Sequence, residues 1–283
     1  MEENKNKTEN KEVVAREGGR RRRHKHKPNH RPQEAQKQAE KQVEKQSQKQ
    51  QPKPQKQQNV AIKEKQADKA QARDNKKDEN RKDTYLYTLD GNLYVNLTNK
   101  CSNGCDFCVR NERASYYGNY LWLRHGDPTV EKVIAAASGF GDLSKFKEVV
   151  FCGFGEPTYK VAEMVKLCDF FHEKGLKTRL NTNGQGNLIN KRDIVPELKG
   201  KIDFVNVSLN ASCYEKYQPV CRSQFGESGY TGLIEFAKLC RQNGIPCRFS
   251  IVDCIGEAEV EACKRLAESV RIPLYVRKYI ADS

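Results

Sequence analysis

From about residue 84 to the end, short runs of apolar and β-branched residues alternate with longer segments whose apolar residues recur every three or four positions. A short apolar run bounded by polar or glycine-containing segments is typical of a buried strand. The apolar spacing of the longer segments predicts helices that bury one face. Six strands are expected, at residues 93–98, 147–152, 177–182, 202–209, 247–253 and 274–280.

Helices are expected at residues 161–174, 231–242 and 258–270, with a fourth that begins after residue 127. The first stops at Gly175, and glycine commonly ends a helix. The third has glutamates crowded at its start, where the helix dipole favours negative charge. For the fourth, Asp127 is the expected N-cap and Pro128 is expected in the first turn.

The order of these elements predicts an α/β fold. Alternating strands and helices indicate parallel strands joined by right-handed crossovers. A complete eight-unit barrel takes about 250 residues, or roughly 31 per unit, and the folded segment 84–283 has 200 residues. We therefore expect a partial (β/α)6 TIM-like barrel. The alternative is an open doubly wound sheet, but the glycine-rich phosphate fingerprint of that fold does not follow the first expected strand.

Residues 1–83 have a different composition. They carry 25 Lys and Arg against 14 Asp and Glu, a net charge of +11, whereas residues 84–283 carry a net charge of +3. The segment contains no aromatic residue and no cysteine, so it cannot bury enough apolar surface to offset its ordering entropy. We expect a disordered basic tail before a folded domain at 84–283. The run Arg20–Lys27 could contact nucleic acid or an anionic membrane surface, or could only keep the chain in solution.

Sequence features also bear on location. No apolar stretch approaches the roughly 18–20 residues that cross a bilayer, and the first residues lack the apolar core of a secretory signal. The expected location is therefore cytoplasmic. All 11 cysteines follow residue 100, and in a reducing compartment they indicate metal binding or small buried side chains. Cys168, Cys240 and Cys263 are expected to be buried on helix faces.

Three cysteines follow the first expected strand at closely spaced positions, Cys101, Cys105 and Cys108. Gly104 is expected to let the chain turn tightly between them. Thiolates suit zinc and iron–sulfur clusters, and a closed site of either kind wants four protein ligands. Three ligands leave one position open for a small molecule. A zinc loop that borrows a distant fourth ligand is the alternative.

The triplet resembles the C-x3-C-x2-C signature of the radical SAM superfamily, which has an aromatic residue just before the last cysteine, as Phe107 is here. The resemblance implies a [4Fe-4S] cluster held by Cys101, Cys105 and Cys108, with S-adenosylmethionine on the fourth iron. It further implies an enzyme that cleaves this cofactor reductively to a 5′-deoxyadenosyl radical, on a substrate that the sequence does not identify. A reductant such as flavodoxin or ferredoxin would then be a partner.

Further motifs of the superfamily follow the next strands. Residues 153–157 resemble its glycine-rich motif ending in Glu-Pro, which implies a contact with the amino group of S-adenosylmethionine. The Thr-Asn-Gly ending at 182–184 and the alternating pair at 208 and 210, which face the same way on a strand, imply contacts with ribose or carboxylate. Tight turns and ordinary strand ends are the alternatives. The candidate cofactor-binding residues are Phe107, Gly153, Phe154, Gly155, Glu156, Asn183, Ser208 and Asn210.

Two weaker expectations concern the walls of the pocket. The ends of the fifth and sixth strands, at 251–253 and 275–277, should flank the adenine. The loop after the cysteines is rich in aromatic residues, including Tyr116 and Trp122, and could cap the substrate side or simply pack on the surface.

The segment 84–283 as a whole looks like a group of radical SAM proteins associated with TatD-type metal-dependent hydrolases, which implies a TatD-family hydrolase as a possible partner. A rival function is a nucleic-acid-binding protein whose zinc or iron–sulfur site is purely structural, and the basic tail favours it. A third is an activase that makes a radical on a protein partner. The sequence points to no catalytic residue beyond the cofactor ligands.

Overall fold

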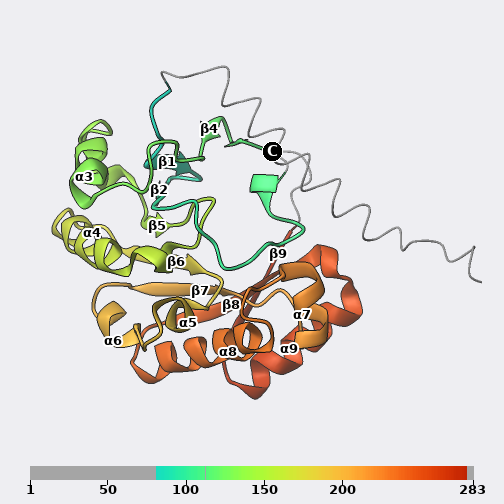
Figure 1. Cartoon of the computed structure of the whole chain (residues 1–283). Helices are drawn as coiled ribbons and strands as arrows, with labels where there is room; N and C mark the ends of the chain where they lie inside the picture. The colour runs from blue at the N-terminus through green and yellow to red at the C-terminus, as the bar shows by residue number, and fades with distance from the viewer. Residues whose placement is uncertain (1–80, 112, 279–283) are drawn as a thin grey trace, which may run out of the picture. The chain divides into compact units, whose positions relative to one another are not determined.

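The computed structural model describes residues 81–111 and 113–278 (Figure 1). The main sheet has the strand order β1-β2-β5-β6-β7-β8-β9, in which β1 is antiparallel to β2 and the later neighbours are parallel. Its strands are β1 (Leu86–Leu89), β2 (Asn92–Val95), β5 (Val149–Phe151), β6 (Thr178–Thr182), β7 (Phe204–Ser208), β8 (Cys247–Val252) and β9 (Leu274–Arg277). A separate ribbon consists of β3 (Ser115–Tyr116) and β4 (Asn119–Tyr120).

The sheet confirms the predicted α/β fold and its partial (β/α)6 TIM-like arrangement. Each of the six expected strands is present, and they are neighbours in the order in which they occur along the chain. Strand β1 was not predicted. It forms a hairpin with β2 through Asp90 and Gly91, which have φ angles of 52° and 77°. Asp-Gly is a strong signal for such a turn, so the sequence did contain the information.

The helices are α3 (Val130–Ser138), α4 (Val161–Glu173), α5 (Gly186–Asn190), α6 (Val195–Leu198), α7 (Tyr214–Cys221), α8 (Glu227–Gln242) and α9 (Glu257–Ser269). Short 3-10 helices are η1 (Val109–Asn111), η2 (Leu143–Lys145), η3 (Pro157–Lys160) and η4 (Asp253–Ile255). The four expected helices correspond to α3, α4, α8 and α9. Within the described residues, no helix combines the length and the apolar character that a bilayer crossing requires.

The expected N-cap of α3 is wrong by two residues. Thr129, not Asp127, has the extended backbone of an N-cap, and its hydroxyl accepts a hydrogen bond from the Lys132 amide at 3.4 Å. Asp127 instead lies 4.0 Å from the Lys160 ammonium. Threonine caps a helix nearly as well as aspartate, so local propensity does not separate the two.

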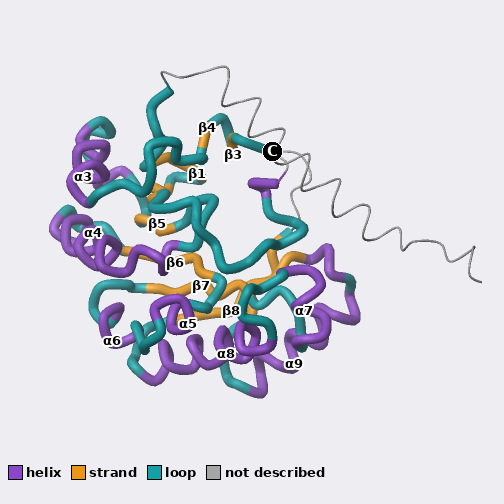
Figure 2. Tube along the Cα trace, viewed as in Figure 1, coloured by secondary structure: helices purple, strands orange, loops and turns teal. Residues whose placement is uncertain are grey.

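Side chains alternate between two faces of the sheet. One face is apolar and packs against the helices, which Figure 2 shows around the outside of the strands. Leu93, Phe151, Leu180, Val207 and Phe249 on this face are fully buried. Cys168, Cys240 and Cys263 are buried in the same core, as predicted. The opposite face carries many polar residues, which a sheet covered by helices on both sides would exclude.

Most of the predicted tail at 1–83, including Arg20–Lys27, lies outside the described residues, as do positions 279 and 280 of the sixth expected strand. Asp83 is described and is tied to the domain. Its carboxylate accepts hydrogen bonds from the backbone amides of Arg124 at 2.7 Å and His125 at 3.1 Å.

Candidate active site

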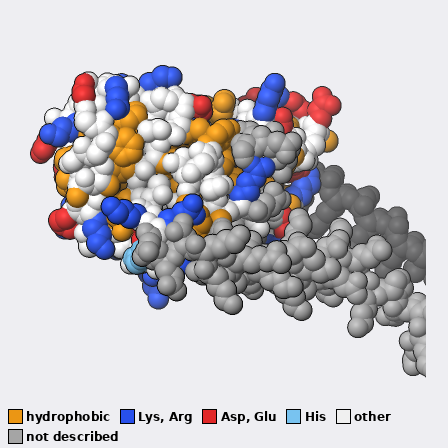
Figure 3. Space-filling view, turned by 90° about the horizontal axis from the view of Figure 1, so that it is seen from above, with side chains coloured by type: hydrophobic (Ala, Val, Ile, Leu, Met, Phe, Trp, Pro, Cys, Tyr) orange, Lys and Arg blue, Asp and Glu red, His pale blue; other side chains and the backbone are white. Residues whose placement is uncertain are grey.

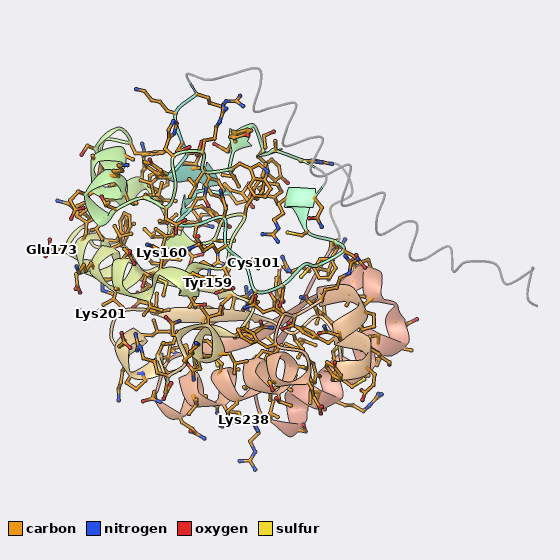
Figure 4. All side chains as sticks on the ribbon, viewed as in Figure 1. Cys101, Tyr159, Lys160, Glu173, Lys201 and Lys238 are labelled. Atoms are coloured by element: carbon orange, nitrogen blue, oxygen red, sulfur yellow. The ribbon has the colours of Figure 1, made fainter. Side chains whose placement is uncertain are left out.

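The cysteine loop directly follows β2, at the edge of the sheet where the parallel strands end. Cys101, Cys105 and Cys108 line one cavity of about 270 Å³. Figure 4 shows Cys101 in the middle of the described domain and Lys238 of α8 on its outside. The other residues that line the cavity are Asn103, Phe107, Val109, Tyr116, Asn183, Ser208, Asn210, Val252, Arg277 and Lys278.

The three thiols share one cavity, and their arrangement can be compared with what a single ion and a cluster require. Among the described side chains, no three of His, Cys, Asp and Glu lie close enough together to hold one metal ion. A cubane cluster makes a different demand, because each cysteine binds a different iron. Three thiols spread around one cavity match that demand.

Burial controls the protonation of these thiols. It raises the pKa of Cys101 to about 12, with the nearby Glu156 carboxylate as a smaller cause. Burial also raises the pKa of Cys108. The pKa of Cys105 is raised by its contact with the Cys221 thiol and by burial. Neutral thiols are therefore favoured near pH 7 unless a cation compensates for the thiolate charge, which the irons of a cluster would do.

A buried polar network holds the cysteine loop in place. Gln185, which is fully buried after β6, is its centre. Its side-chain oxygen accepts hydrogen bonds from the hydroxyls of Ser102 at 2.7 Å and Ser223 at 3.2 Å. Its amide nitrogen donates to Asn103 Oδ1 and to the Tyr217 hydroxyl, both at 3.0 Å. The network was not predicted, because its members come from three distant segments of the chain, at 102–103, 185 and 217–223.

Replacing Gln185 with alanine is expected to lower the free energy of unfolding by about 2 kcal/mol, since it leaves several buried polar groups without partners. Chemical denaturation measures this. Gln224→Ala is the matched control, because Gln224 is exposed and its side chain donates one long hydrogen bond, to the Tyr159 hydroxyl at 3.4 Å, while its backbone bond to the Ser102 carbonyl does not need the side chain. Equal losses in the two variants would contradict the role of the network.

The glycine-rich segment after β5 packs against the cysteine loop through its backbone. A Cβ added to Gly155 would lie 2.2 Å from the Thr98 carbonyl oxygen, and one added to Gly153 would lie 2.1 Å from Asn96 Oδ1. The amide of Glu156 donates to the Lys100 carbonyl at 2.7 Å. Only glycine permits these approaches.

Alanine at Gly155 is expected to destabilise the fold by about 3 kcal/mol, because two backbone segments must separate to admit the methyl group. The same change at Gly104 is expected to stay within about 0.5 kcal/mol. Gly104 does not have a left-handed φ, and a Cβ there would meet only Arg222 Cβ, at 3.8 Å. The expectation that Gly104 is needed for a tight turn is therefore wrong. Thermal or chemical unfolding of the two variants tests the contrast, and a stable Gly155→Ala protein would contradict it.

The side chains of this segment point away from the cavity. Phe154 is buried in a small aromatic cluster, with its ring edge-to-face against Trp122 at 5.3 Å. The Glu156 carboxylate is also buried. One oxygen accepts from the hydroxyls of Thr158 at 2.8 Å and Thr182 at 2.7 Å and from the Thr158 amide at 3.2 Å, and the other accepts from the Asn183 amide at 2.7 Å. Burial raises the pKa of Glu156, and these hydrogen bonds oppose the rise.

Arg110 links the same two loops. Its guanidinium donates to the backbone carbonyls of Asn99 at 3.3 Å and Asn103 at 3.2 Å in the cysteine loop, and to that of Phe154 at 3.4 Å. The positive charge also acts to lower the pKa of each of the three motif thiols. Arg110 therefore offsets part of the effect of burial, although the pKa of each thiol stays above its ordinary value.

Three more predicted residues do face the cavity. Asn183 donates to the Ser102 hydroxyl at 2.8 Å and lies 3.9 Å from Cys101 Sγ. Ser208 ends β7, and Asn210 follows it with a left-handed φ of 59°. Asn210 Oδ1 is buried and has no hydrogen-bond partner within the described chain. A buried acceptor without a partner is rare, and here it belongs to a residue that lines the cavity.

The structure thus brings together eleven predicted residues in two groups. The cavity contains the three cysteines with Phe107, Asn183, Ser208 and Asn210. The segment from Gly153 to Glu156 does not line the cavity but packs against the chain that leads into the cysteine loop. Tyr116 and Arg277, which the weaker expectations placed near the pocket, line it as well. Asn103, Val109 and Lys278 were missed, because Asn103 is an unspecified position inside the cysteine motif and the other two lie outside the motifs.

Comparison with known proteins identifies the family of the chain. The sequence profile of the radical SAM superfamily matches residues 95–267. The chain therefore belongs to the radical SAM superfamily and is an enzyme of that class. Membership implies an iron–sulfur cluster and S-adenosylmethionine as cofactors.

The individual proteins that resemble this chain share limited sequence identity with it. An uncharacterized protein of Methanocaldococcus jannaschii is 30% identical over 125 residues, which is 44% of this chain and 36% of that protein. Among solved structures, a radical SAM methyltransferase from Sphaerobacter thermophilus is 17% identical over 68% of each chain, with a TM-score of 0.46. SuiB from Streptococcus suis, bound to S-adenosylmethionine, is 19% identical over 66% of this chain and 40% of its own, with a TM-score of 0.48.

Proposed function

We propose that Cys101, Cys105 and Cys108 hold a [4Fe-4S] cluster and that the cavity they line binds S-adenosylmethionine beside it. The observation that carries the proposal is that these three thiols share one cavity with Asn183 and Asn210, at the carboxyl ends of parallel strands. Active sites of barrels with this topology lie at that end of the strands.

The chemistry comes from the cofactors and the placement from the chain. When bound, the cluster and S-adenosylmethionine together supply one-electron reductive cleavage to a 5′-deoxyadenosyl radical, which acts on a substrate not yet identified. The residues of the chain would bind and orient the cofactor. Asn210 Oδ1, buried and unpartnered among the described residues, would accept a hydrogen bond from an amino or hydroxyl group of the cofactor. Ser208 and Asn183 would donate to its carboxylate or ribose, and Phe107 would exclude water.

The segment Gly153–Glu156 would contribute through its backbone. Its side chains are already occupied, Phe154 in the aromatic cluster and Glu156 in four hydrogen bonds. The Phe154 carbonyl already accepts a hydrogen bond from Arg110 at 3.4 Å, and a carbonyl oxygen can accept a second one. A contact with the amino group of S-adenosylmethionine would therefore use a carbonyl oxygen rather than the Glu156 carboxylate.

The proposal extends to the wider setting of the protein. It places the chain in the TatD-associated group of radical SAM proteins, in the cytoplasm, with flavodoxin or ferredoxin as reductant and a TatD-family hydrolase as a possible partner. The basic tail at 1–83 precedes the catalytic domain at 84–283 and would contact nucleic acid through its positive charge.

The test is anaerobic purification of the full chain, followed by metal analysis and reaction with dithionite and S-adenosylmethionine. We expect about four irons per chain, because one cubane holds four, and release of 5′-deoxyadenosine and methionine. A lone zinc, or an iron–sulfur signal that does not change on addition of S-adenosylmethionine, would overturn the proposal and favour the structural-metal alternative.

A further inference from the structure

Three arginines line the polar face of the sheet, on the side that does not pack against the helices of the core. Arg179 lies on β6, Arg248 on β8 and Arg277 at the end of β9. The register places Asn206 opposite Arg248, and Tyr275 lies two positions before Arg277 on the same face of β9. We call Arg179, Arg248 and Arg277 the arginine row.

The positive charge of the row is only partly compensated. Arg179 pairs with Glu148 through two nitrogens, at 2.8 and 3.0 Å. Arg248 donates to Asn206 Oδ1 at 2.8 Å and lies over the Tyr275 ring, 4.2 Å from its centroid. Throughout the described ranges, no carboxylate forms an ion pair with Arg248 or Arg277. Burial, together with the charges of Arg179 and Arg277, lowers the pKa of Arg248, as expected for cations held close together.

One end of the row, at Arg277, is exposed and adjoins the active site, whereas Arg179 and Arg248 are partly buried. Tyr275, on which Arg248 stacks, is 46% exposed, and Arg277 is exposed. Arg277 also lines the cavity of the three cysteines. By contrast, Lys and Arg mix with Asp and Glu on the outer surface seen in Figure 3. A run of cations on one inner face, adjoining the cavity, is therefore distinct from the general surface charge.

We infer that the arginine row is the substrate subsite and that it binds an oxyanion group, so that the substrate is a small molecule bearing a phosphate or carboxylate. The planar guanidinium fork recognises both groups through paired hydrogen bonds. Asn206 and Tyr275 hold Arg248 in place before the ligand arrives, which reduces the entropy lost on binding. The inference rests on the proposed function, because it places the substrate next to the cofactor cavity.

Binding of inorganic pyrophosphate and of citrate to the full chain, measured by calorimetry, tests the inference. We expect Arg248→Gln combined with Arg277→Gln to weaken binding of at least one probe by about tenfold, since a charged hydrogen bond is lost at each position. The control is Arg265→Gln on the outer helix α9, where Arg265 is exposed. It removes the same charge and should leave both affinities within about twofold. Binding by the basic tail is common to all variants.

Circular dichroism shows whether the double variant is folded. If it is not, the binding measurements are made with Arg277→Gln alone, which should fold because Arg277 is exposed. Weakening of pyrophosphate binding alone indicates a phosphate-bearing substrate, and weakening of citrate binding alone a carboxylate. Equal affinities in the row variants and the Arg265 control overturn the inference, as does a loss confined to S-adenosylmethionine binding.

The two proposals fail separately. A wild-type chain that contains no iron, or that does not cleave S-adenosylmethionine, would overturn the proposed function. The binding of pyrophosphate and citrate could still be measured in that chain and would still test the arginine row. The Cys105→Ala chain should still bind the probes like the wild type, because the arginine row belongs to the sheet and not to the cysteine loop.

Discussion

Replacing Cys105 with alanine is expected to abolish release of 5′-deoxyadenosine from S-adenosylmethionine and to remove most of the bound iron. Cys105 is the middle cysteine of the triplet and lines the cavity. Two remaining thiols hold a cubane cluster poorly, because each missing ligand exposes a further iron to solvent. Iron per chain and chromatography of the reaction products measure the two effects.

A matched control for this variant is Cys240→Ala, since Cys240 is fully buried in α8 and does not line the cavity. It should keep iron and activity at a small cost in stability. Cys221 makes the Cys105 variant more informative. The Cys105 thiol donates to the Cys221 carbonyl at 3.7 Å, and Asn210 donates to the Cys221 sulfur at 3.6 Å. Turnover that persists in Cys105→Ala and disappears when Cys221 is also replaced would show that the ligand assignment is wrong.

Alanine at Glu156 is expected to lower the free energy of unfolding by about 4 kcal/mol, the largest stability effect predicted for this chain. The carboxylate is 3% exposed and accepts four hydrogen bonds from Thr158, Thr182 and Asn183. Its removal leaves these donors buried without an acceptor. Glutamine should cost about half as much, because it keeps one oxygen but turns a donor toward another donor. Chemical denaturation of both variants gives the comparison.

Glu235→Ala is the control for this pair, since Glu235 is exposed on α8 and forms only a 3.7 Å ion pair with Lys238. It should change stability by less than about 0.5 kcal/mol. A Glu156→Ala protein of wild-type stability that fails to bind S-adenosylmethionine would reverse the assignment, because it would give the carboxylate a direct role in the cofactor site.

Much of the fold could be predicted because its signals are local. A short β-branched run becomes a strand wherever a sheet is available, so all six parallel strands were located. The cysteines lie within eight residues of one another, and their loop follows a strand, so the cavity end of the sheet was predictable. Residues at the ends of later strands, such as Asn183 and Asn210, then reach the same cavity because parallel strands end at one edge.

Other features depend on contacts between distant parts of the chain. At the start of α3, Thr129 is the N-cap, and the carboxylate of Asp127 instead lies 4.0 Å from the Lys160 ammonium. The motif at 153–157 placed Glu156 among the candidate cofactor-binding residues, but Thr158 and the neighbouring end of β6 already hydrogen-bond both of its oxygens. Gln185 has no motif around it, and its role depends on Ser102, Asn103 and Tyr217.

The sequence by itself determined the class of this protein, because a ligand triplet, a glycine-rich turn and a strand–helix alternation are all written in neighbouring residues. Only the tertiary structure decided which polar side chains face the cavity and which form the hydrogen bonds that hold its loops in place. It also decided that three arginines lie on one face of the sheet. The physical reason is range: the Asn103–Tyr217 hydrogen bond joins positions 114 residues apart, and no local pattern specifies such a contact.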